Sequence, residues 1–159
     1  MLSVRKAEQS DALLYYEWAN EKAVRRQSFN SEKITLEEHV QWFEKKITDS
    51  TCIMLIFENK ERQPVGQVRF QQENEEVYVV GISVDAAFRG KGLAPQILIM
   101  ASEYFFSVHP LKKIHAFIKQ DNMASVHSFE KAGYANPKLT EVNGIKSFIY
   151  TKENANANS

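Results

Sequence analysis

The sequence predicts a layered α/β (α+β) protein, with a mixed, mostly antiparallel sheet of about six to seven strands flanked by about four helices. Short runs rich in β-branched and aromatic residues alternate with segments whose apolar residues recur at helical spacing. Within residues 52–84 the runs are joined by only a few residues, which favours antiparallel pairing. We expect a single domain at residues 1–151 and a frayed polar tail at residues 152–159.

The composition argues against several classes of protein. The chain carries 20 Lys and Arg against 20 Asp and Glu, so no net charge recruits nucleic acid. No apolar run reaches the length of about eighteen residues that spans a bilayer, so we expect no membrane partner. The N-terminus lacks a signal-peptide pattern, and we expect a cytoplasmic protein. Cys52 is the single cysteine, which excludes an internal disulfide and a cysteine-based zinc cluster, and we expect no metal site.

The N-terminal segment predicts a strand followed by a helix. Alternation at residues 2–7 indicates a short strand, and Asp11 is placed to cap a helix that continues to about Asn20. Residues 21–33 are polar with little periodicity, so we interpret them as a loop or a broken helix.

A second helix is predicted by a capping-box pattern at Thr35 and Glu38, and it continues to about Thr48. Its apolar face recurs at steps of four, three and four and consists of Leu36, Val40, Phe43 and Ile47. The opposite side carries His39 and Trp42, so we expect these two large side chains to face something other than the core.

Three strands and a glycine-rich loop follow. The strands are expected at residues 52–58, 64–71 and 77–84. The loop Arg89–Gly92 offers consecutive backbone N–H groups with little side-chain bulk, and apolar residues recur at helical spacing from Leu93. Because a helix N-terminus has unpaired N–H groups and a positive dipole end, this loop suits an anion such as a pyrophosphate. Its spacing matches neither the P-loop signature nor the dinucleotide fingerprint.

The rest of the chain predicts one more strand, one more helix and a final hairpin. The strand lies at residues 112–119, and the helix is capped by Asn122 and ended by Gly133. The final strands are short and lie at residues 134–137 and 147–150, around a turn signal at Asn143-Gly144.

Two segments resemble the signatures of one family. Arg89-Gly90-Lys91-Gly92-Leu93-Ala94 fits the pattern Gln/Arg-x-x-Gly-x-Gly/Ala, with a strand before it and a helix after it. Residues 121–134 open on Asn122, place Ser125 three residues later and close on Glu130-Lys131-Ala132-Gly133-Tyr134. Both segments resemble the GNAT (N-acetyltransferase) superfamily, and the order of the predicted elements is similar to that fold over nearly the whole chain.

The resemblance implies acetyl-CoA as the cofactor and direct acetyl transfer to a primary amine. In this family the strand before the loop diverges from the strand after its helix, and the gap admits the pantetheine arm. The cofactor-binding residues that the resemblance implies are Ile82, Ser83, Val84, Arg89, Gly90, Lys91, Gly92, Leu93, Ala94, Asn122, Ser125 and Phe129.

The catalytic groups are indicated less directly. Many family members place a tyrosine that protonates the departing thiolate where this chain has Phe129, which cannot donate a proton. Tyr134 or Ser83 is an alternative donor, and departure without an acid or protonation by water is another. For the base, the candidates are His39, His115 and His127. His39 is preferred because the N-terminal helices line the acceptor side in this family, and a water chain is the alternative.

The acceptor side is suggested by four residues of the N-terminal third: Trp18, Arg25, His39 and Trp42. Their arrangement resembles acetyltransferases of nucleotide-linked amino sugars, in particular the one in the pseudaminic acid pathway. An indole can stack on the base or the sugar, and Arg25 can pair with the diphosphate of a UDP- or dTDP-linked amino sugar.

Other interpretations of the same residues stay open. These features are shared with enzymes that acetylate protein N-termini, including those of ribosomal proteins. A non-catalytic acyl-CoA-binding module, an interaction domain, a packing role for both tryptophans and a homodimer are also compatible with the sequence.

Overall fold

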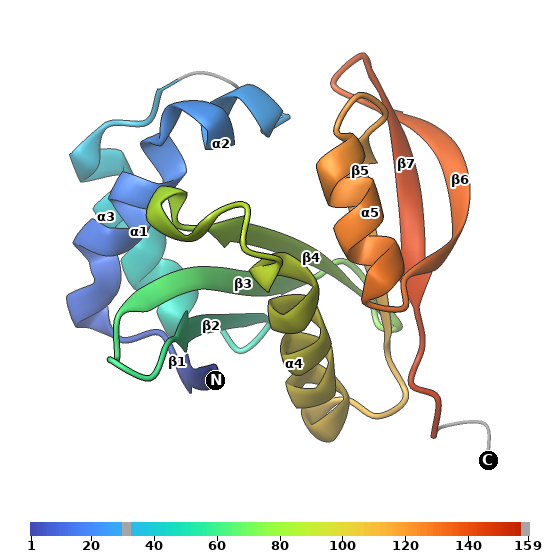
Figure 1. The fold of residues 1–159 in the computed structure, drawn as a ribbon, viewed down its shortest axis with the longest axis horizontal. Helices are drawn as coiled ribbons and strands as arrows, with labels where there is room; N and C mark the ends of the chain where they lie inside the picture. The colour runs from blue at the N-terminus through green and yellow to red at the C-terminus, as the bar shows by residue number, and fades with distance from the viewer. Residues whose placement is uncertain (30–32, 157–159) are drawn as a thin grey trace.

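The computed structural model describes residues 1–29 and 33–156, and Figure 1 shows a sheet with helices on both of its faces. The strands are β1 (Ser3–Lys6), β2 (Cys52–Glu58), β3 (Pro64–Gln72), β4 (Val77–Val84), β5 (Lys113–Lys119), β6 (Ala135–Val142) and β7 (Ile145–Lys152). The helices are α1 (Ala12–Asn20), α2 (Lys22–Gln27), α3 (Leu36–Ile47), α4 (Leu93–Val108) and α5 (Met123–Lys131), with short 3₁₀ turns η1 (Gln9–Asp11) and η2 (Ala86–Phe88). The predicted fold class is confirmed, and the sheet of the described residues has seven strands.

Two neighbouring strands of the sheet, β4 and β5, separate at one end. The sheet runs β1-β2-β3-β4-β5-β7-β6, with β2, β3 and β4 in consecutive antiparallel pairs as the short connections predict. β4 and β5 are parallel, and they pair only where Val77–Val79 lies beside Lys113–His115. Beyond these residues the two strands diverge, so residues 80–84 of β4 do not pair with β5 (Figure 1).

Alternate strand residues face two separate cores. On one face α4 and α5 pack on the sheet in the larger core. On the other face, α1 and α3 enclose a smaller core whose buried members are Tyr15, Phe43, Met54 and Ile56. In β3, Val68 and Phe70 belong to the larger core, so the intervening Gln67 and Arg69 point to the side of α1 and α3.

β3 approaches α4 closely at Gly66. A Cβ atom at this position would lie 2.8 Å from the backbone oxygen of Ser83 and 3.2 Å from the side chain of Ile97. A larger residue would therefore push β3 away from β4 and from α4, which explains the glycine.

Residues 22–27 form α2, which fits the broken-helix alternative, while residues 30–32 of that segment lie outside the described residues. Two other local expectations are corrected. Asp11 occupies the N-cap position of α1 but does not cap it, because its carboxylate accepts from Arg5 at 2.8 and 2.9 Å and from the Glu8 N–H at 2.7 Å. β6 and β7 each have 8 residues and are longer than predicted, since the mostly exposed side chains of edge strand β6 show little alternation.

α3 also presents a different face from the predicted one. Phe43 is buried as expected, but Leu36 is 47% exposed. His39, which was expected to face away from the core, is only 5% exposed. Its ring centre lies 6.1 Å from that of Tyr16 and 5.1 Å from that of Trp42. The helix thus turns its His39 side toward α1, and periodicity alone does not reveal this packing partner.

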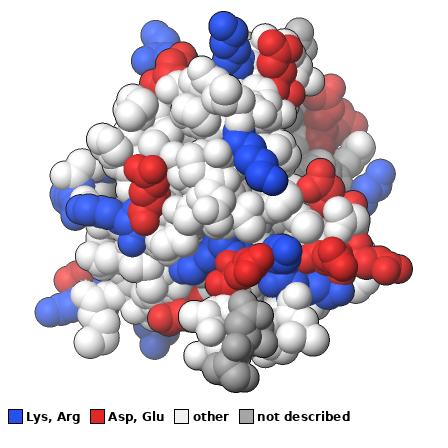
Figure 2. Space-filling model, turned by 90° about the vertical axis from the view of Figure 1, so that its right-hand side faces the viewer, with Lys and Arg blue, Asp and Glu red and all other residues white. Residues whose placement is uncertain are grey.

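Surface charge is mixed on the face that Figure 2 shows, where Lys and Arg side chains are interspersed with Asp and Glu. None of the helices in residues 1–29 and 33–156 is long and apolar enough to cross a membrane. The same residues contain no group of His, Cys, Asp and Glu that could hold a metal ion.

Candidate functional site

The loop between β4 and α4 presents backbone N–H groups at the start of a helix of 16 residues. Gly90 and Gly92 have left-handed backbone angles, with φ of 76° and 71°, and Gly92 is the N-cap residue of α4. A Cβ atom at either glycine would meet no atom within 4 Å, so the space around the loop is open. Because Gly92 has no side chain to cap the helix, the first N–H groups can bind an anion.

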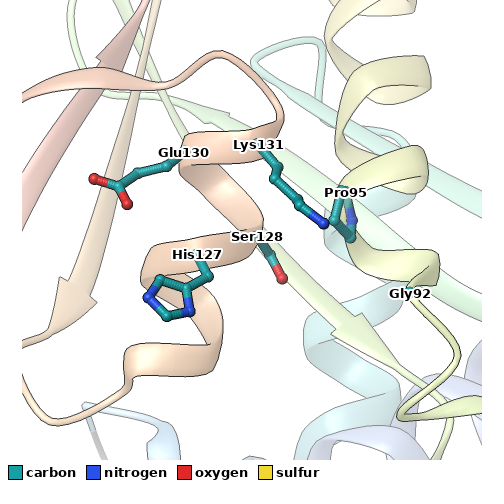
Figure 3. Close-up of a pocket in the computed structure, with 6 residues that line it drawn as sticks. All are labelled: Gly92, Pro95, His127, Ser128, Glu130 and Lys131. Atoms are coloured by element: carbon teal, nitrogen blue, oxygen red, sulfur yellow. The ribbon is translucent and has the colours of Figure 1, made fainter.

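A pocket of about 630 Å³ lies between the first turn of α4 and α5. It is lined by Gly92, Pro95, His127, Ser128, Glu130 and Lys131. Figure 3 shows the side chains of Ser128 and Lys131 directed toward α4, whereas Glu130 points away. His127 was considered from the sequence only as a base, and Ser128 and Lys131 were not singled out, although their spacing of three residues places them on one face of α5.

Asn122 holds the start of α5. Its side-chain oxygen accepts a hydrogen bond from the Ser125 N–H at 3.2 Å. Asn122 and Ser125, both predicted to contact the cofactor, are half-buried at this helix start. The cap bond fixes the turn from which the pocket residues of α5 project.

The unpaired edge of β4 leads into the glycine loop. Ile82, Ser83 and Val84 lie beyond the last pair with β5, while their other edge pairs with β3. The hydroxyl of Ser83 accepts a 2.7 Å hydrogen bond from Gln67 Nε2. A Cβ atom at Gly81, two residues before Ser83 and on the same face, would meet no atom within 4 Å. Open space therefore adjoins this edge on the side of α1 and α3.

Basic side chains gather on that side, and we call Arg25, His39 and Arg69 the basic cluster. Arg25 Nε and His39 Nε2 are buried without a hydrogen-bond partner among the described residues. Burial lowers the pKa of His39, and the charges of Arg69 and Arg25 lower it further. The guanidinium of Arg69 lies 5.0 Å from the ring centre of Trp42, and burial lowers the pKa of Arg69 as well.

Two side-chain contacts join the N-terminal helices to the loop that precedes α4. Trp18 Nε1 donates to Asp85 Oδ2 at 2.8 Å. Arg89 Nη2 donates to Glu21 Oε2, also at 2.8 Å, and Arg89 Nε donates to the Val84 carbonyl at 3.0 Å. The buried Trp18 indole, one of the predicted acceptor residues, thus positions the loop through its N–H.

Residues 2–135 match the family described as acetyltransferase (GNAT) domain. The chain belongs to the GNAT acetyltransferase family. A curated relative, the uncharacterized protein MJ1062 of Methanocaldococcus jannaschii, is 25% identical over 137 residues. That match covers 85% of this chain, which spans 28% of the length of the relative.

Solved structures share the GNAT fold along the chain. A spermidine N-acetyltransferase from Vibrio cholerae, in complex with CoA and spermine, superposes with a TM-score of 0.87 at 20% identity and covers 99% of this chain and 98% of its own. The aminoglycoside acetyltransferase AAC(6')-Ib, in complex with coenzyme A and kanamycin, has a TM-score of 0.82 at 16% identity and covers 96% and 95%. These likenesses confirm the predicted GNAT architecture.

Three features of this GNAT chain fit coenzyme A, the cofactor that the family implies. The start of α4, with its two left-handed glycines, suits a diphosphate. The unpaired edge of β4 suits the amides of an extended pantetheine arm, which can add to a sheet as a strand does. The pocket between α4 and α5 leaves room beside the start of α4.

The candidate proton donors of this GNAT domain lie in different surroundings. Tyr134 is 2% exposed, and its hydroxyl lies 3.1 Å from Ser102 Oγ inside the larger core. Burial raises the pKa of Tyr134. Phe129 is 3% exposed, and its ring packs against Tyr134 with the centres 4.9 Å apart. Ser83, in contrast, is half-buried at the open edge of β4.

Proposed function

We propose that the protein transfers the acetyl group of acetyl-CoA to the primary amine of a small nucleotide-linked amino sugar. The separation of β4 and β5 supports the transfer, because it opens a strand edge next to the helix start that suits the diphosphate of CoA. The basic cluster supports the kind of acceptor, since two arginines there suit a negatively charged group.

Donor binding is assigned to backbone groups and to the pocket. Bound acetyl-CoA supplies its acetyl group as a thioester that reacts with amines. The N–H groups of Gly90–Gly92 and of the first turn of α4 bind the diphosphate, and the backbone of Ile82–Val84 orients the pantetheine arm. Lys131 adds a cation to the wall of the pocket.

His39 is proposed as the base. Burial and the charges of Arg69 and Arg25 lower the pKa of this side chain, so the ring is neutral near pH 7. Nε2 is buried and has no hydrogen-bond partner among the described residues. With the ring proton on Nδ1, Nε2 can accept a proton from the acceptor amine, directly or through one water molecule.

Ser83 is proposed as the proton donor ahead of Tyr134. Its oxygen accepts from Gln67 Nε2, which leaves the hydroxyl hydrogen free to donate at the open edge of β4. The hydroxyl of Tyr134 instead faces Ser102 in the core. Phe129 cannot donate, and we assign it to the packing of α5 on the sheet.

Turnover of acetyl-CoA with a panel of amines tests this function. We expect a UDP- or dTDP-linked amino sugar to release free CoA thiol faster than spermidine, kanamycin or a peptide that begins with Ser or Ala. UDP should compete with the acceptor and not with acetyl-CoA. Efficient acetylation of the peptide without competition by UDP would replace this proposal with protein N-terminal acetylation, and CoA binding with no turnover would indicate a binding module.

A further inference from the structure

We propose that Arg69, together with Arg25, forms the binding site for the diphosphate of the acceptor. This inference rests on the proposed acetyl transfer and names the residue that selects the substrate. Sequence patterns assign no role to Arg69, because an arginine in an alternating strand is ordinarily a solvated residue.

Strand register places Arg69 in the middle of the sheet. It lies in β3 opposite Met54 of β2 and Gly81 of β4. Its side chain points to the α1–α3 side, where the guanidinium lies over Trp42 at 5.0 Å from the ring centre. The residue is half-buried, so part of it stays accessible to a ligand.

The charge of Arg69 has no carboxylate partner among the described residues. Arg5 pairs with Asp11 and Glu58, and Arg89 pairs with Glu21. Cys52 and Tyr15 favour the charged form of Arg69 only when they are ionised, and both are neutral near pH 7, so neither provides a counter-ion. Because a desolvated cation without a counter-ion destabilises a protein, this position suits an anion brought by a ligand.

Neighbouring side chains also present polar atoms without a partner. Tyr15 Oη, Arg25 Nε and His39 Nε2 are each buried and have no hydrogen-bond partner among the described residues. The charge of Arg69 acts on both Tyr15 and His39, and the charge of Arg25 acts on His39, so these groups lie in one region. Tyr15 Oη and Arg25 Nε can donate hydrogen bonds, for which the oxygens of a diphosphate are strong acceptors, whereas His39 Nε2 is kept for the amine of the acceptor.

Gly81 leaves space for such a ligand next to Arg69. The two residues are directly opposite in the β3–β4 pair, so they share a face of the sheet. A Cβ atom at Gly81 would meet no atom within 4 Å on that face. The same position borders the gap between β4 and β5, where the pantetheine arm is proposed to bind.

The site discriminates between kinds of acceptor. Two arginine cations in a partly desolvated region repel an ammonium group, whereas they attract phosphate. We therefore expect this chain to discriminate against polycationic acceptors such as spermidine and kanamycin, which carry several ammonium groups.

The test measures the binding of inorganic pyrophosphate and UDP to the full chain by calorimetry. CoA is present at saturation, so that the helix start of α4 is occupied and the probes report on the second site. The variants are Arg69→Gln and Arg25→Gln, with Arg26→Gln as the matched control, because Arg26 is the exposed neighbour of Arg25 on α2. We expect Arg69→Gln to weaken both probes by about tenfold or more and Arg26→Gln to leave them unchanged.

Separate titrations with CoA distinguish the two proposals. Failure of the wild-type chain to bind CoA would overturn the acetyl transfer. CoA binding with no UDP or pyrophosphate binding, or with equal affinity in wild type and Arg69→Gln, would overturn the diphosphate site alone. Should Arg69→Gln fail to fold, Gly81→Val tests the same site. The backbone of Gly81 is not left-handed, so valine fits there, and the valine side chain fills the open space next to Arg69. UDP binding that persists in Gly81→Val would overturn the site, and its loss with CoA binding retained would support it.

Discussion

The proposed donor and acceptor sites near the gap between β4 and β5 are built from different parts of the chain. On the donor side, the groups proposed to bind come mainly from the backbone, at the glycine loop, the start of α4 and the free edge of β4. On the acceptor side they are side chains from α2, α3 and β3, which lie far apart in the sequence. A backbone site needs a local pattern of small residues, whereas a side-chain site needs the tertiary fold to assemble it.

The largest effect on binding is expected when a backbone site receives a side chain. Gly92→Val places a β-branched residue at φ 71°, which costs roughly 1–2 kcal/mol, and puts a side chain in front of the helix start. We expect the affinity for CoA to fall on the order of a hundredfold or more, measured by calorimetry. Gly144→Val is the matched control, since Gly144 has φ 78° and open space in the β6–β7 turn. Equal losses of CoA affinity in both variants would contradict the donor assignment.

The next effect concerns the proposed base. His39→Gln removes the group that accepts the proton, and we expect kcat to fall roughly 10²- to 10⁴-fold while the affinity for CoA is kept. His127→Gln is the comparison on the donor side, because His127 lines the pocket beside α4 and should change CoA affinity more than kcat. The dependence of kcat on pH provides a second measurement, since its acidic limb should disappear in His39→Gln. An unchanged kcat would leave the role of base to water.

A smaller effect is expected at the edge of the acceptor side. Arg25→Ala should raise the KM of the sugar-nucleotide acceptor by about tenfold to a hundredfold, as expected for loss of a charge-assisted hydrogen bond. The KM of acetyl-CoA should change little. Steady-state kinetics with Arg26→Ala, which removes an exposed arginine from the same helix, provides the control. A parallel rise in both Michaelis constants would show that the two sides are not independent.

The smallest effect is on stability. In the folded state the pKa of His39 is lowered by burial and by two arginines, so the unfolded chain binds more protons between its ordinary pKa of about 6.5 and the lowered value. The free energy of unfolding should therefore decrease as the pH falls through this window. His39→Gln should make that decrease shallower in urea unfolding at several pH values. His109→Gln is a useful comparison, because burial and Lys112 also lower the pKa of His109.

The sequence is most informative where structure depends on neighbouring residues. The hairpin of β2 and β3, the glycine loop, α4 and the Asn122 cap of α5 all follow from local patterns and lie close to the predicted positions. Edge strand β6 was predicted too short because its solvated side chains lack alternation. Membership of the GNAT family, suggested by the two short segments, is shown by the match over residues 2–135.

The acceptor side was less predictable because it depends on which faces meet. His39 was recognised as a candidate, but its burial between α3 and α1 depends on helix packing that periodicity does not specify. Arg69 gave no signal, since only the register with Gly81 and the stacking on Trp42 reveal its surroundings. The α5 residues of the pocket are an intermediate case. Their helix was predicted, but its position beside α4 was not.

The contacts of Trp18 with Asp85 and of Glu21 with Arg89 connect the N-terminal helices to the loop before α4. They therefore link the proposed acceptor site to the proposed CoA site. A change that one bound substrate makes through these contacts in the affinity for the other must be matched by an equal factor in the opposite direction, because binding free energies around a closed cycle are reciprocal. Dissociation constants measured in both orders of addition therefore reveal any cooperativity between the two substrates.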